Sequence, residues 1–406
     1  MDSLIAAAAQ ALAAGDPLGA LKRVSLRNDA PALALRGVAM AQLGDLVRAK
    51  DLLRKAARAF GPKEAVARAR CVVAEAEIAL VSRDLSWPAK ALDTARVALE
   101  QRGDRMNAAH ARHLEVRRLL LIGHLDEAER ALAKFNAAPL PPVLRAAHEL
   151  VVAGIAIRRL RIKTARAALV EAERTARLAG IPALMAEIES AALVLNTPAA
   201  RLIAPGEERL LLLDEVEALL ASGAIVVDAC RHVVRNTKTV ISLARRPVLF
   251  ALARALGEAW PADVPRSTLL ARAFRAKHAD ESHRARLRVE IGRLRAKLKA
   301  LADVSATAQG FALAPRRSRN VVVLAPPVED DHASVLAFLA DGEFWSSSAL
   351  SLALGASART VQRALDALAA ADKVQSYGRG RARRWMIRPV PAFTTTLLLP
   401  GPLPSG

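Results

Sequence analysis

Apolar residues recur at helical spacing through the first 200 residues, and short turns with glycine or proline interrupt them at intervals. The segment "GVAMAQLGDLVRAKDLLRKAARAFGPK", residues 37–63, contains two such stretches joined by a Leu-Gly turn. Small residues fall where two helices must approach closely, and a proline ends the second helix: Gly37, Gly44, Ala49, Ala56 and Pro62. Because each helix pair leaves an apolar face for its neighbour to cover, we expect residues 1–200 to form a stacked α-solenoid with a concave face.

The spacing in residues 37–63 resembles a tetratricopeptide repeat: a small residue, the Leu-Gly turn, two alanines seven apart and then a proline. Weaker copies centre on Ala20, Ala91, Ala128 and Ala165, and the last three alanines are 37 residues apart, close to the period of that family. The resemblance implies a helical region that contacts another protein, self-associates or senses a ligand.

The pattern changes after a Pro- and Gly-containing stretch, residues 196–209, which we interpret as a linker. An amphipathic helix over 210–221 comes first, and the apolar period then falls to about two, which predicts three short strands within 224–243. Helices are predicted at 246–257, 265–275 and 282–301, followed by a strand pair around Gly310. We expect an α+β domain over residues 205–322.

A second linker, residues 314–331, contains Pro326-Pro327 and precedes three more helical stretches, around 332–340, 347–354 and 357–371. A strand, a Gly/Arg turn and a strand follow in "KVQSYGRGRARRWMIRP". We expect a second α+β domain over 329–390 and a loose tail over 391–406. The fold class is therefore mainly α.

The chain carries 60 basic and 40 acidic residues, a formal net charge of +20 that favours a polyanionic partner, either nucleic acid or an acidic membrane surface. Its apolar runs are shorter than the ~20 residues that span a bilayer, so we expect a soluble protein with no membrane partner. Cys71 and Cys230 are far apart and predict no disulfide framework, which favours a reducing cytoplasm.

The stretch "RLRVEIGRLRAKL", residues 286–298, carries the sharpest local charge pattern. One helical face is apolar and predicted to be buried: Leu287, Ile291, Leu294 and Leu298. The opposite face is small or short and is edged by Arg286, Arg293 and Lys297: Ala285, Val289, Gly292 and Ala296. A small-residue surface edged by arginines lets a helix axis approach a groove while guanidinium groups reach phosphates or base edges. The alternative is an ordinary solvated face of an amphipathic helix.

The order of strands, helices, basic helix and hairpin over about 224–314 resembles the OmpR/PhoB-type winged-helix DNA-binding domain. Its most specific element here is Ile291, Leu294, Arg295, Lys297 and Leu298, and the spacing from Val304 to Gly310-Phe311 is similar to the antibiotic-regulatory (SARP-like) branch. The resemblance implies a recognition-helix role for Arg286, Arg288, Arg293, Arg295 and Lys297, and a role in the hairpin, or wing, for Gln309 and Gly310. Arg295 lies nearer the core side, where it reaches a backbone phosphate or caps a structural carboxylate. The wing threonine of the family corresponds to Ala306 or to Thr307.

Residues 346–374 have the sequence pattern of a helix-turn-helix, with Gly355 in the turn and Ser357 as the N-cap of the next helix. Outward positions near the start of that helix are Arg359, Thr360, Gln362 and Arg363, where a recognition helix meets base edges. The hairpin that follows carries Arg379, Arg381, Arg383 and Arg384. This segment is similar to a second winged helix of bacterial regulators, and the alternative is an Arg-rich solvated hairpin.

The sequence holds no phosphate-binding loop, nucleophile elbow or HExxH motif, so we expect no catalytic residues, no enzyme activity, no metal and no cofactor. His110 and His113 have metal-like spacing but lack further ligands, and we interpret them as ordinary helix-surface histidines.

Together these patterns predict a bacterial-type, cytoplasmic, nucleoid-associated transcriptional regulator that binds double-stranded DNA sequence-specifically. Its helical repeats would contact RNA polymerase or another protein, form a homodimer or sense an effector. The alternative is a repeat-based adaptor whose winged helices mediate protein–protein contacts. The arginine placement separates the two, because an adaptor does not need it.

Overall fold

The computed structural model describes residues 2–85, 87–134, 140–274, 281–318, 320–327, 332–339, 344–378, 380 and 383–387. It is mainly helical, with small sheets. The chain divides into two compact units. The array unit comprises residues 1–158, 163–192 and 334–406, and the sheet unit comprises 159–162 and 193–333. Within the described residues, no helix combines the length and the apolar character needed to cross a membrane.

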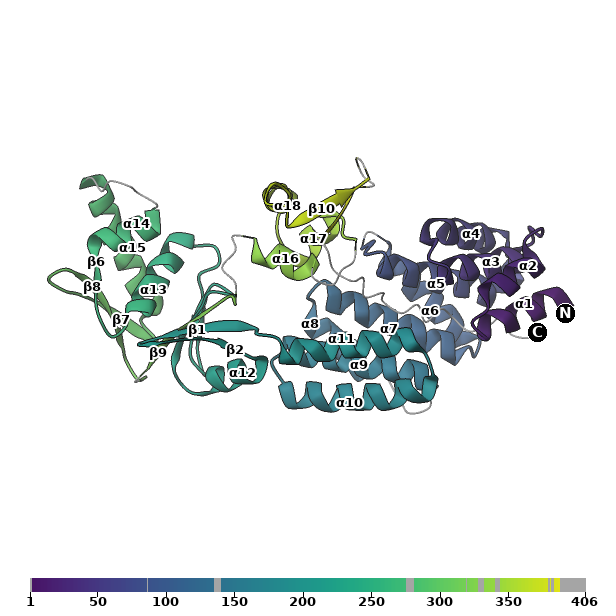
Figure 1. Ribbon diagram of the computed structural model, residues 1–406, viewed down its shortest axis with the longest axis horizontal. Helices are drawn as coiled ribbons and strands as arrows, with labels where there is room; N and C mark the ends of the chain where they lie inside the picture. The colour runs from purple at the N-terminus through teal and green to yellow at the C-terminus, as the bar shows by residue number, and fades with distance from the viewer. Residues whose placement is uncertain are drawn as a thin grey trace. The chain divides into compact units, whose positions relative to one another are not determined.

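The N-terminal part of the array unit is a series of helices, and from α1 to α9 each helix packs against the next (Figure 1). They are α1 (Ser3–Ala13), α2 (Pro17–Val24), α3 (Ala30–Gln42), α4 (Leu46–Ala59), α5 (Ala65–Val81), α6 (Ala89–Gln101), α7 (Arg105–Leu121), α8 (Leu125–Ala133), α9 (Pro142–Arg158), α10 (Ile162–Ala179) and α11 (Pro182–Leu193), with a short 3₁₀ turn at Pro62–Glu64. A second 3₁₀ turn, Val194–Asn196, follows α11 and belongs to the sheet unit.

The turns between paired helices repeat a Gly-Asp sequence. Gly44 and Gly103 have φ angles of +86° and +79°, the left-handed region that glycine enters at little cost, so each ends the preceding helix. The next residue, Asp45 or Asp104, then caps the following helix by accepting a backbone N–H at 3.1 or 3.2 Å. Two adjacent residues, a glycine and an aspartate, therefore end one helix and begin the next.

Small residues let the paired helices pack closely, as predicted. A Cβ atom added to Gly37 in α3 would lie 2.8 Å from Leu53 Cγ in α4. Five of the alanines in the repeat pattern are fully buried: Ala20, Ala49, Ala56, Ala128 and Ala165. Ala91 is only half-buried, and Leu92 takes the buried position four residues after the N-cap of α6. Ala91 was therefore wrong as a repeat centre, because the helix starts one residue later than the 37-residue spacing requires.

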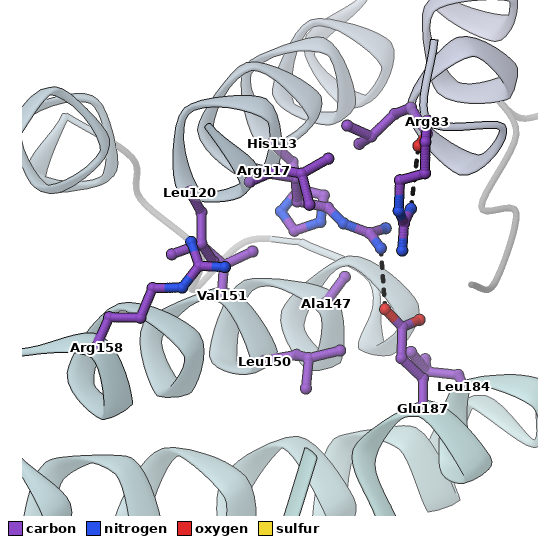
Figure 2. Close-up of a pocket in the computed structure, with 12 residues that line it drawn as sticks. Arg83, His113, Arg117, Leu120, Ala147, Leu150, Val151, Arg158, Leu184 and Glu187 are labelled. Atoms are coloured by element: carbon purple, nitrogen blue, oxygen red, sulfur yellow. Dashed lines mark hydrogen bonds and ion pairs between the residues drawn. The ribbon is translucent and has the colours of Figure 1, made fainter. Parts of the chain in front are cut away.

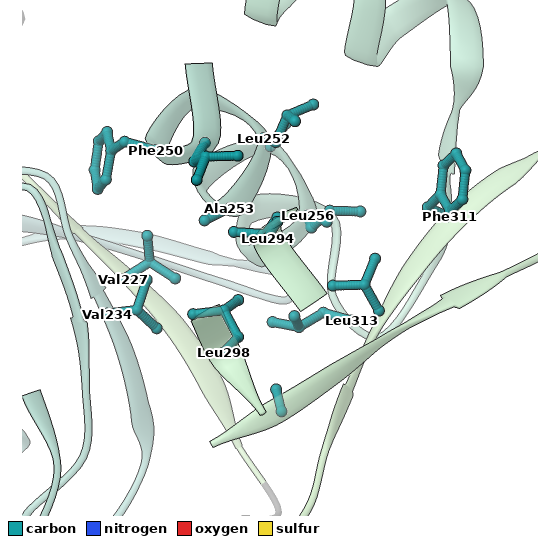
Figure 3. Close-up of a cluster of buried hydrophobic side chains, with 14 of the residues drawn as sticks. Val227, Val234, Phe250, Leu252, Ala253, Leu256, Leu294, Leu298, Phe311 and Leu313 are labelled. Carbon is teal, nitrogen blue, oxygen red and sulfur yellow. The ribbon is translucent and has the colours of Figure 1, made fainter. Parts of the chain in front are cut away.

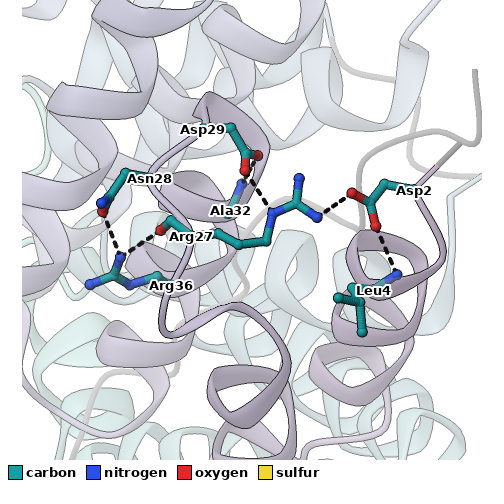
Figure 4. Close-up of polar contacts among 7 residues, drawn as sticks. All are labelled: Asp2, Leu4, Arg27, Asn28, Asp29, Ala32 and Arg36. Atoms are coloured by element: carbon teal, nitrogen blue, oxygen red, sulfur yellow. Dashed lines mark hydrogen bonds and ion pairs between the residues drawn. The ribbon is translucent and has the colours of Figure 1, made fainter.

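Polar contacts hold the first helix against the loop before α3 (Figure 4). The Arg27 guanidinium donates to the carboxylates of Asp2, the N-cap of α1, and of Asp29, the N-cap of α3, the latter at 2.7 Å. The hydrogen bond from Arg27 lowers the pKa of Asp2. One arginine thus connects the caps of two helices that are not adjacent in sequence.

The C-terminal part of the array unit contains the three predicted helices, α16 (Ala333–Leu339), α17 (Ser347–Leu354) and α18 (Ala358–Ala370), and the hairpin β10 (Val374–Tyr377) and β11 (Arg384–Ile387). Trp345 and Trp385 are fully buried and exchange two backbone hydrogen bonds of 2.9 and 2.7 Å. Their hydrophobic cluster also includes residues of α7 and α9, and the Arg83 guanidinium lies 5.6 Å from the centroid of the Trp345 ring.

The sheet unit is built on six strands in the order β2-β1-β9-β3-β4-β5. They are β1 (Ala200–Ala204), β2 (Glu207–Leu211), β3 (Ile225–Asp228), β4 (Val233–Arg235), β5 (Val240–Ser242) and β9 (Val321–Ala325), with helix α12 (Leu213–Ala221) between β2 and β3. The three strands predicted within 224–243 are β3, β4 and β5.

Both predicted linkers were wrong in part. Pro205 and Gly206 form the tight turn of the β1–β2 hairpin, with Gly206 at φ +74°, instead of marking a break. The run Val321–Ala325 is the central strand β9, parallel to β3 and antiparallel to β1. All five of its residues are buried, which explains the continuous apolar run between an Arg-rich stretch and Pro326-Pro327.

The predicted helices and strand pair follow in order: α13 (Pro247–Ala259), α14 (Arg266–Phe274), α15 (Glu281–Leu298), β7 (Ala302–Ala306) and β8 (Gly310–Pro315). A short strand that was not predicted, β6 (Val264–Pro265), lies between α13 and α14. The last three strands form a second sheet in the order β6-β8-β7. Helix α13 approaches the larger sheet so closely that a Cβ on Gly257 would lie 3.0 Å from Val227 and 3.1 Å from Val323. Leucines of α13 and α15 meet β8 in one core (Figure 3).

Candidate nucleic-acid interface

Helix α15 has one buried face and one open face, as its sequence predicts. Leu287, Ile291, Leu294 and Leu298 are at most 2% exposed and belong to the core that α13 and the β-strands share. The opposite residues are exposed: Ala285, Val289, Gly292 and Ala296. The buried leucines fix the rotation of the helix, so the small residues form its solvent face.

Gly292 stands in the middle of this open face. A Cβ atom added there would meet nothing within 4 Å among the described residues. A glycine inside a helix costs about 0.5–1 kcal/mol relative to alanine, and no neighbour within the described chain requires it here. Gly292 therefore leaves room on the outer surface at the expense of helix stability.

The predicted arginines of α15 differ in how their guanidinium groups are held. Arg286 lies over the Phe274 ring at 4.7 Å from its centroid. Arg293 donates to Glu290 at 2.7 Å, and Arg288 lies 3.9 Å from Glu281. The side chains of Arg288 and Arg293 are 74% and 59% exposed, so these surface ion pairs are weak and exchange readily for another anion. Lys297 is exposed as well.

Arg295 has a different environment. Its guanidinium donates twice to the Val304 carbonyl, at 3.0 and 2.5 Å, and lies 3.2 Å from the Asp303 carboxylate. These contacts tie the last turn of α15 to strand β7. Of the two roles expected for Arg295, its contact with the Asp303 carboxylate corresponds to the structural one.

Arg266, which was not a predicted site residue, holds the β7–β8 turn in place by hydrogen bonds. Arg266, the first residue of α14, donates to the carbonyls of Thr307 and Ala308 at 3.2 and 3.1 Å. Its backbone N–H donates to the Gln309 carbonyl at 3.3 Å. Gln309 itself is exposed. The acceptors of the Arg266 side chain lie 41 and 42 residues later in the chain, so local sequence patterns do not indicate this role.

Two further residues of the same turn, Thr307 and Gly310, have structural roles. Thr307, rather than Ala306, supplies the hydroxyl: its Oγ1 accepts from the Gly310 N–H at 2.9 Å and donates to Asp263. A Cβ on Gly310 would lie 1.8 Å from the Val264 carbonyl oxygen, because β6 pairs directly with β8 there. Gly310 is therefore required by the sheet.

Helix α18 shows a second set of predicted residues, in the array unit. Ser357 caps the helix by accepting the Thr360 N–H at 3.1 Å, as predicted. Arg359, Thr360 and Arg363 are exposed. Gln362 is half-buried: it donates to Asp366 at 2.8 Å and accepts from Ser347 at 3.2 Å. Gln362 thus connects α18 to α17.

The β10–β11 hairpin carries the remaining predicted arginines. The Arg383 guanidinium lies 4.1 Å from the centroid of the Trp385 ring, where it stacks on the aromatic face. Arg379 and Arg381 lie outside the described residues. The α15 set and the α18 set belong to different compact units.

His110 and His113 are not surface residues, contrary to the prediction. They are 2% and 3% exposed, and His110 Nε2 lies 2.8 Å from a carboxylate oxygen of the fully buried Glu77. Their burial comes from the packing of α7 against neighbouring helices, which local spacing does not encode. Among the described residues, no three His, Cys, Asp or Glu side chains gather as a metal site would require.

Comparison with protein-family models, with curated proteins and with solved structures found no match to this chain.

Proposed function

We propose that this protein is a sequence-specific, double-stranded-DNA-binding transcriptional regulator. The helix, strand, helix, helix, strand, strand order from α13 to β8 would be a winged helix, with α15 as the recognition helix and the β7–β8 turn as the wing. The observation that carries the proposal is the solvent face of α15, where an exposed Gly292 without a packing role lies among exposed arginines. A protein–protein adaptor has no need for that combination.

The charge of α15 supports a polyanionic ligand. The helix carries six basic side chains against two acidic ones over 18 residues. Each phosphate that such a helix neutralises releases bound counterions, so affinity would fall with salt by roughly 0.9 log unit per log unit for each contact. Because the ion pairs of Arg288 and Arg293 are exposed, exchanging Glu281 or Glu290 for a phosphate costs little.

The arginines of α15 would divide into two roles. Arg286, Arg288, Arg293 and Lys297 would contact base edges or phosphates, because their charged groups are on exposed residues. Arg295 would instead be a positioning residue that holds β7 against the helix. Arg266 would hold the tip of the wing in the same way.

The α17–α18 pair with the β10–β11 hairpin would be a second winged helix, with Arg359, Thr360 and Arg363 facing DNA and Arg383 near its wing. The stacked helices α1–α11 would be a tetratricopeptide-like solenoid that contacts another protein, including RNA polymerase, joins two copies of the chain or senses an effector. Location at the nucleoid would follow from DNA binding.

The test is a selection of duplex fragments that the full chain retains from random DNA, followed by titration of the selected site. Arg288→Ala should weaken binding to that site, whereas Arg102→Ala, an exposed arginine of the array, should leave it unchanged. Failure to retain any duplex at about 50 mM salt, where phosphate contacts are strongest, would sink the proposal and leave the adaptor function.

A further inference from the structure

A half-open cavity of about 180 Å³ lies within the array unit and is lined by residues of α5, α7, α9 and α11 and by Arg83, which follows α5 (Figure 2). Apolar and polar groups share its walls about equally, and leucine, valine and alanine side chains from all four helices form the apolar part. An apolar cavity of roughly 150 Å³ accommodates benzene, so this space suits a molecule with one six-membered ring or a similar short apolar body.

Positive charge lines the same cavity. Three arginines and one carboxylate are among its lining residues: Arg83, Arg117, Arg158 and Glu187. Arg117 donates to Glu187 at 2.9 Å, so that carboxylate already has a cationic partner. Arg158 has no acidic partner among the described residues, and burial lowers the pKa of its guanidinium. The excess of guanidinium groups would attract one anionic group of a ligand.

A buried polar group points to a second feature of the ligand. His113 is 3% exposed, and its Nε2 has no hydrogen-bond partner within the described chain. Burial lowers the pKa of His113 well below its ordinary value, so the imidazole is neutral at pH 7. Leaving such a buried nitrogen unsatisfied is unfavourable, and a ligand hydroxyl would satisfy it because a hydroxyl both donates and accepts.

We propose that this cavity binds a small organic anion, a carboxylic acid with a single-ring apolar body and a hydroxyl group, in which arginines hold the carboxylate and His113 binds the hydroxyl. This site would make the helical array a sensor of such an acid. It is independent of DNA binding, and it can be tested without DNA.

The experiment titrates the full chain by calorimetry with 3- and 4-hydroxybenzoate, benzoate, benzamide and inorganic phosphate. One of the hydroxybenzoates should bind most tightly, benzoate less tightly, and the uncharged benzamide at least tenfold more weakly than benzoate. Equal binding of benzamide and benzoate would overturn the role of the arginines. Binding of phosphate as tight as that of the ring acids, or no binding of any acid at millimolar concentration, would overturn the site itself.

Variants then assign the groups. Arg158→Gln should weaken the acids at least tenfold, while Arg102→Gln, which changes an exposed arginine away from the cavity, should leave them unchanged. His113→Phe keeps an aromatic ring but removes both ring nitrogens, and it should abolish the preference for a hydroxybenzoate over benzoate. A preference that survives in a folded His113→Phe protein would contradict the hydroxyl contact. The comparison of ligands on the unaltered chain keeps the test valid if that variant does not fold.

Discussion

The two helices proposed to meet DNA, α15 and α18, differ in where their charge lies. Helix α15 carries six basic side chains and exposes a glycine and two alanines between them. Helix α18 carries only Arg359 and Arg363, and its Gln362 bonds within its own domain. A face crowded with cations suits close electrostatic docking, and a nearly neutral one suits a few directed contacts. If the protein binds DNA as proposed, most of the salt-dependent affinity would come from α15.

The largest expected effect tests whether the core positions the open face of α15. Leu294 is fully buried, so Leu294→Ala should lower the free energy of unfolding by about 2–5 kcal/mol by leaving a cavity. Val289 on the opposite face is 53% exposed, and Val289→Ala should change stability by less than about 0.5 kcal/mol. Amide hydrogen exchange across residues 281–313 measures both. Similar losses in the two variants would show that α15 is not oriented by its leucines.

The next effect compares one arginine from each helix. Arg293→Ala in α15 should cost about 1–3 kcal/mol on the selected DNA site and less on a scrambled one, because a base contact is lost. Arg363→Ala in α18 should cost less on the selected site. Fluorescence anisotropy with both duplexes measures the difference. If Arg293→Ala weakens both duplexes equally, α15 docks on phosphates without reading bases, and the contrast between the helices becomes one of charge alone.

A smaller effect on stability is expected from the N-cap of α18. Because Ser357 Oγ accepts the Thr360 N–H at 3.1 Å, Ser357→Ala should lower stability by about 0.5–2 kcal/mol. Ser357→Asp restores a capping acceptor and should recover most of the loss. Urea unfolding of both variants provides the measurement, and equal loss in the two would exclude capping as the cause.

The smallest stability change distinguishes structure from function in α15. Gly292→Ala should raise stability by about 0.5–1 kcal/mol, because the added methyl group enters open space. The same methyl group should weaken DNA binding if the helix axis lies close to a groove. Gly292→Ala protein that is more stable and binds DNA as tightly as the original would contradict close approach along this face.

The sequence was most informative where local periodicity decides the outcome. The four buried residues of α15 follow from their spacing, and Ser357 follows from cap chemistry. The two linker predictions were wrong where turn-forming residues belong to a sheet. Pro205-Gly206 is a hairpin turn, and β9 lies between an Arg-rich stretch and two prolines. Strand pairing with β3 and β1 decides that segment, and its partners are far away in sequence.

The site residues show the same division. Exposure of Arg286, Arg288 and Arg293 could be predicted from the helical pattern. The intramolecular bonds of Arg295 to Val304, and of Arg266 to the β7–β8 turn, depend on how helices and hairpin pack. The burial of His110 likewise depends on Glu77, 33 residues earlier, which lies on another helix. Local sequence patterns therefore predict which side chains are exposed to solvent. Tertiary packing decides which of them already bond to another part of the protein.

One titration tests the central proposal most directly: the full chain against its selected duplex and a scrambled duplex of equal length, at several salt concentrations. DNA binding through α15 predicts affinity for the selected duplex at least about 10³-fold tighter than for the scrambled one. It also predicts a steep loss of affinity with salt that corresponds to several phosphate contacts. Equal affinity for both duplexes, or binding that does not change with salt, would contradict it.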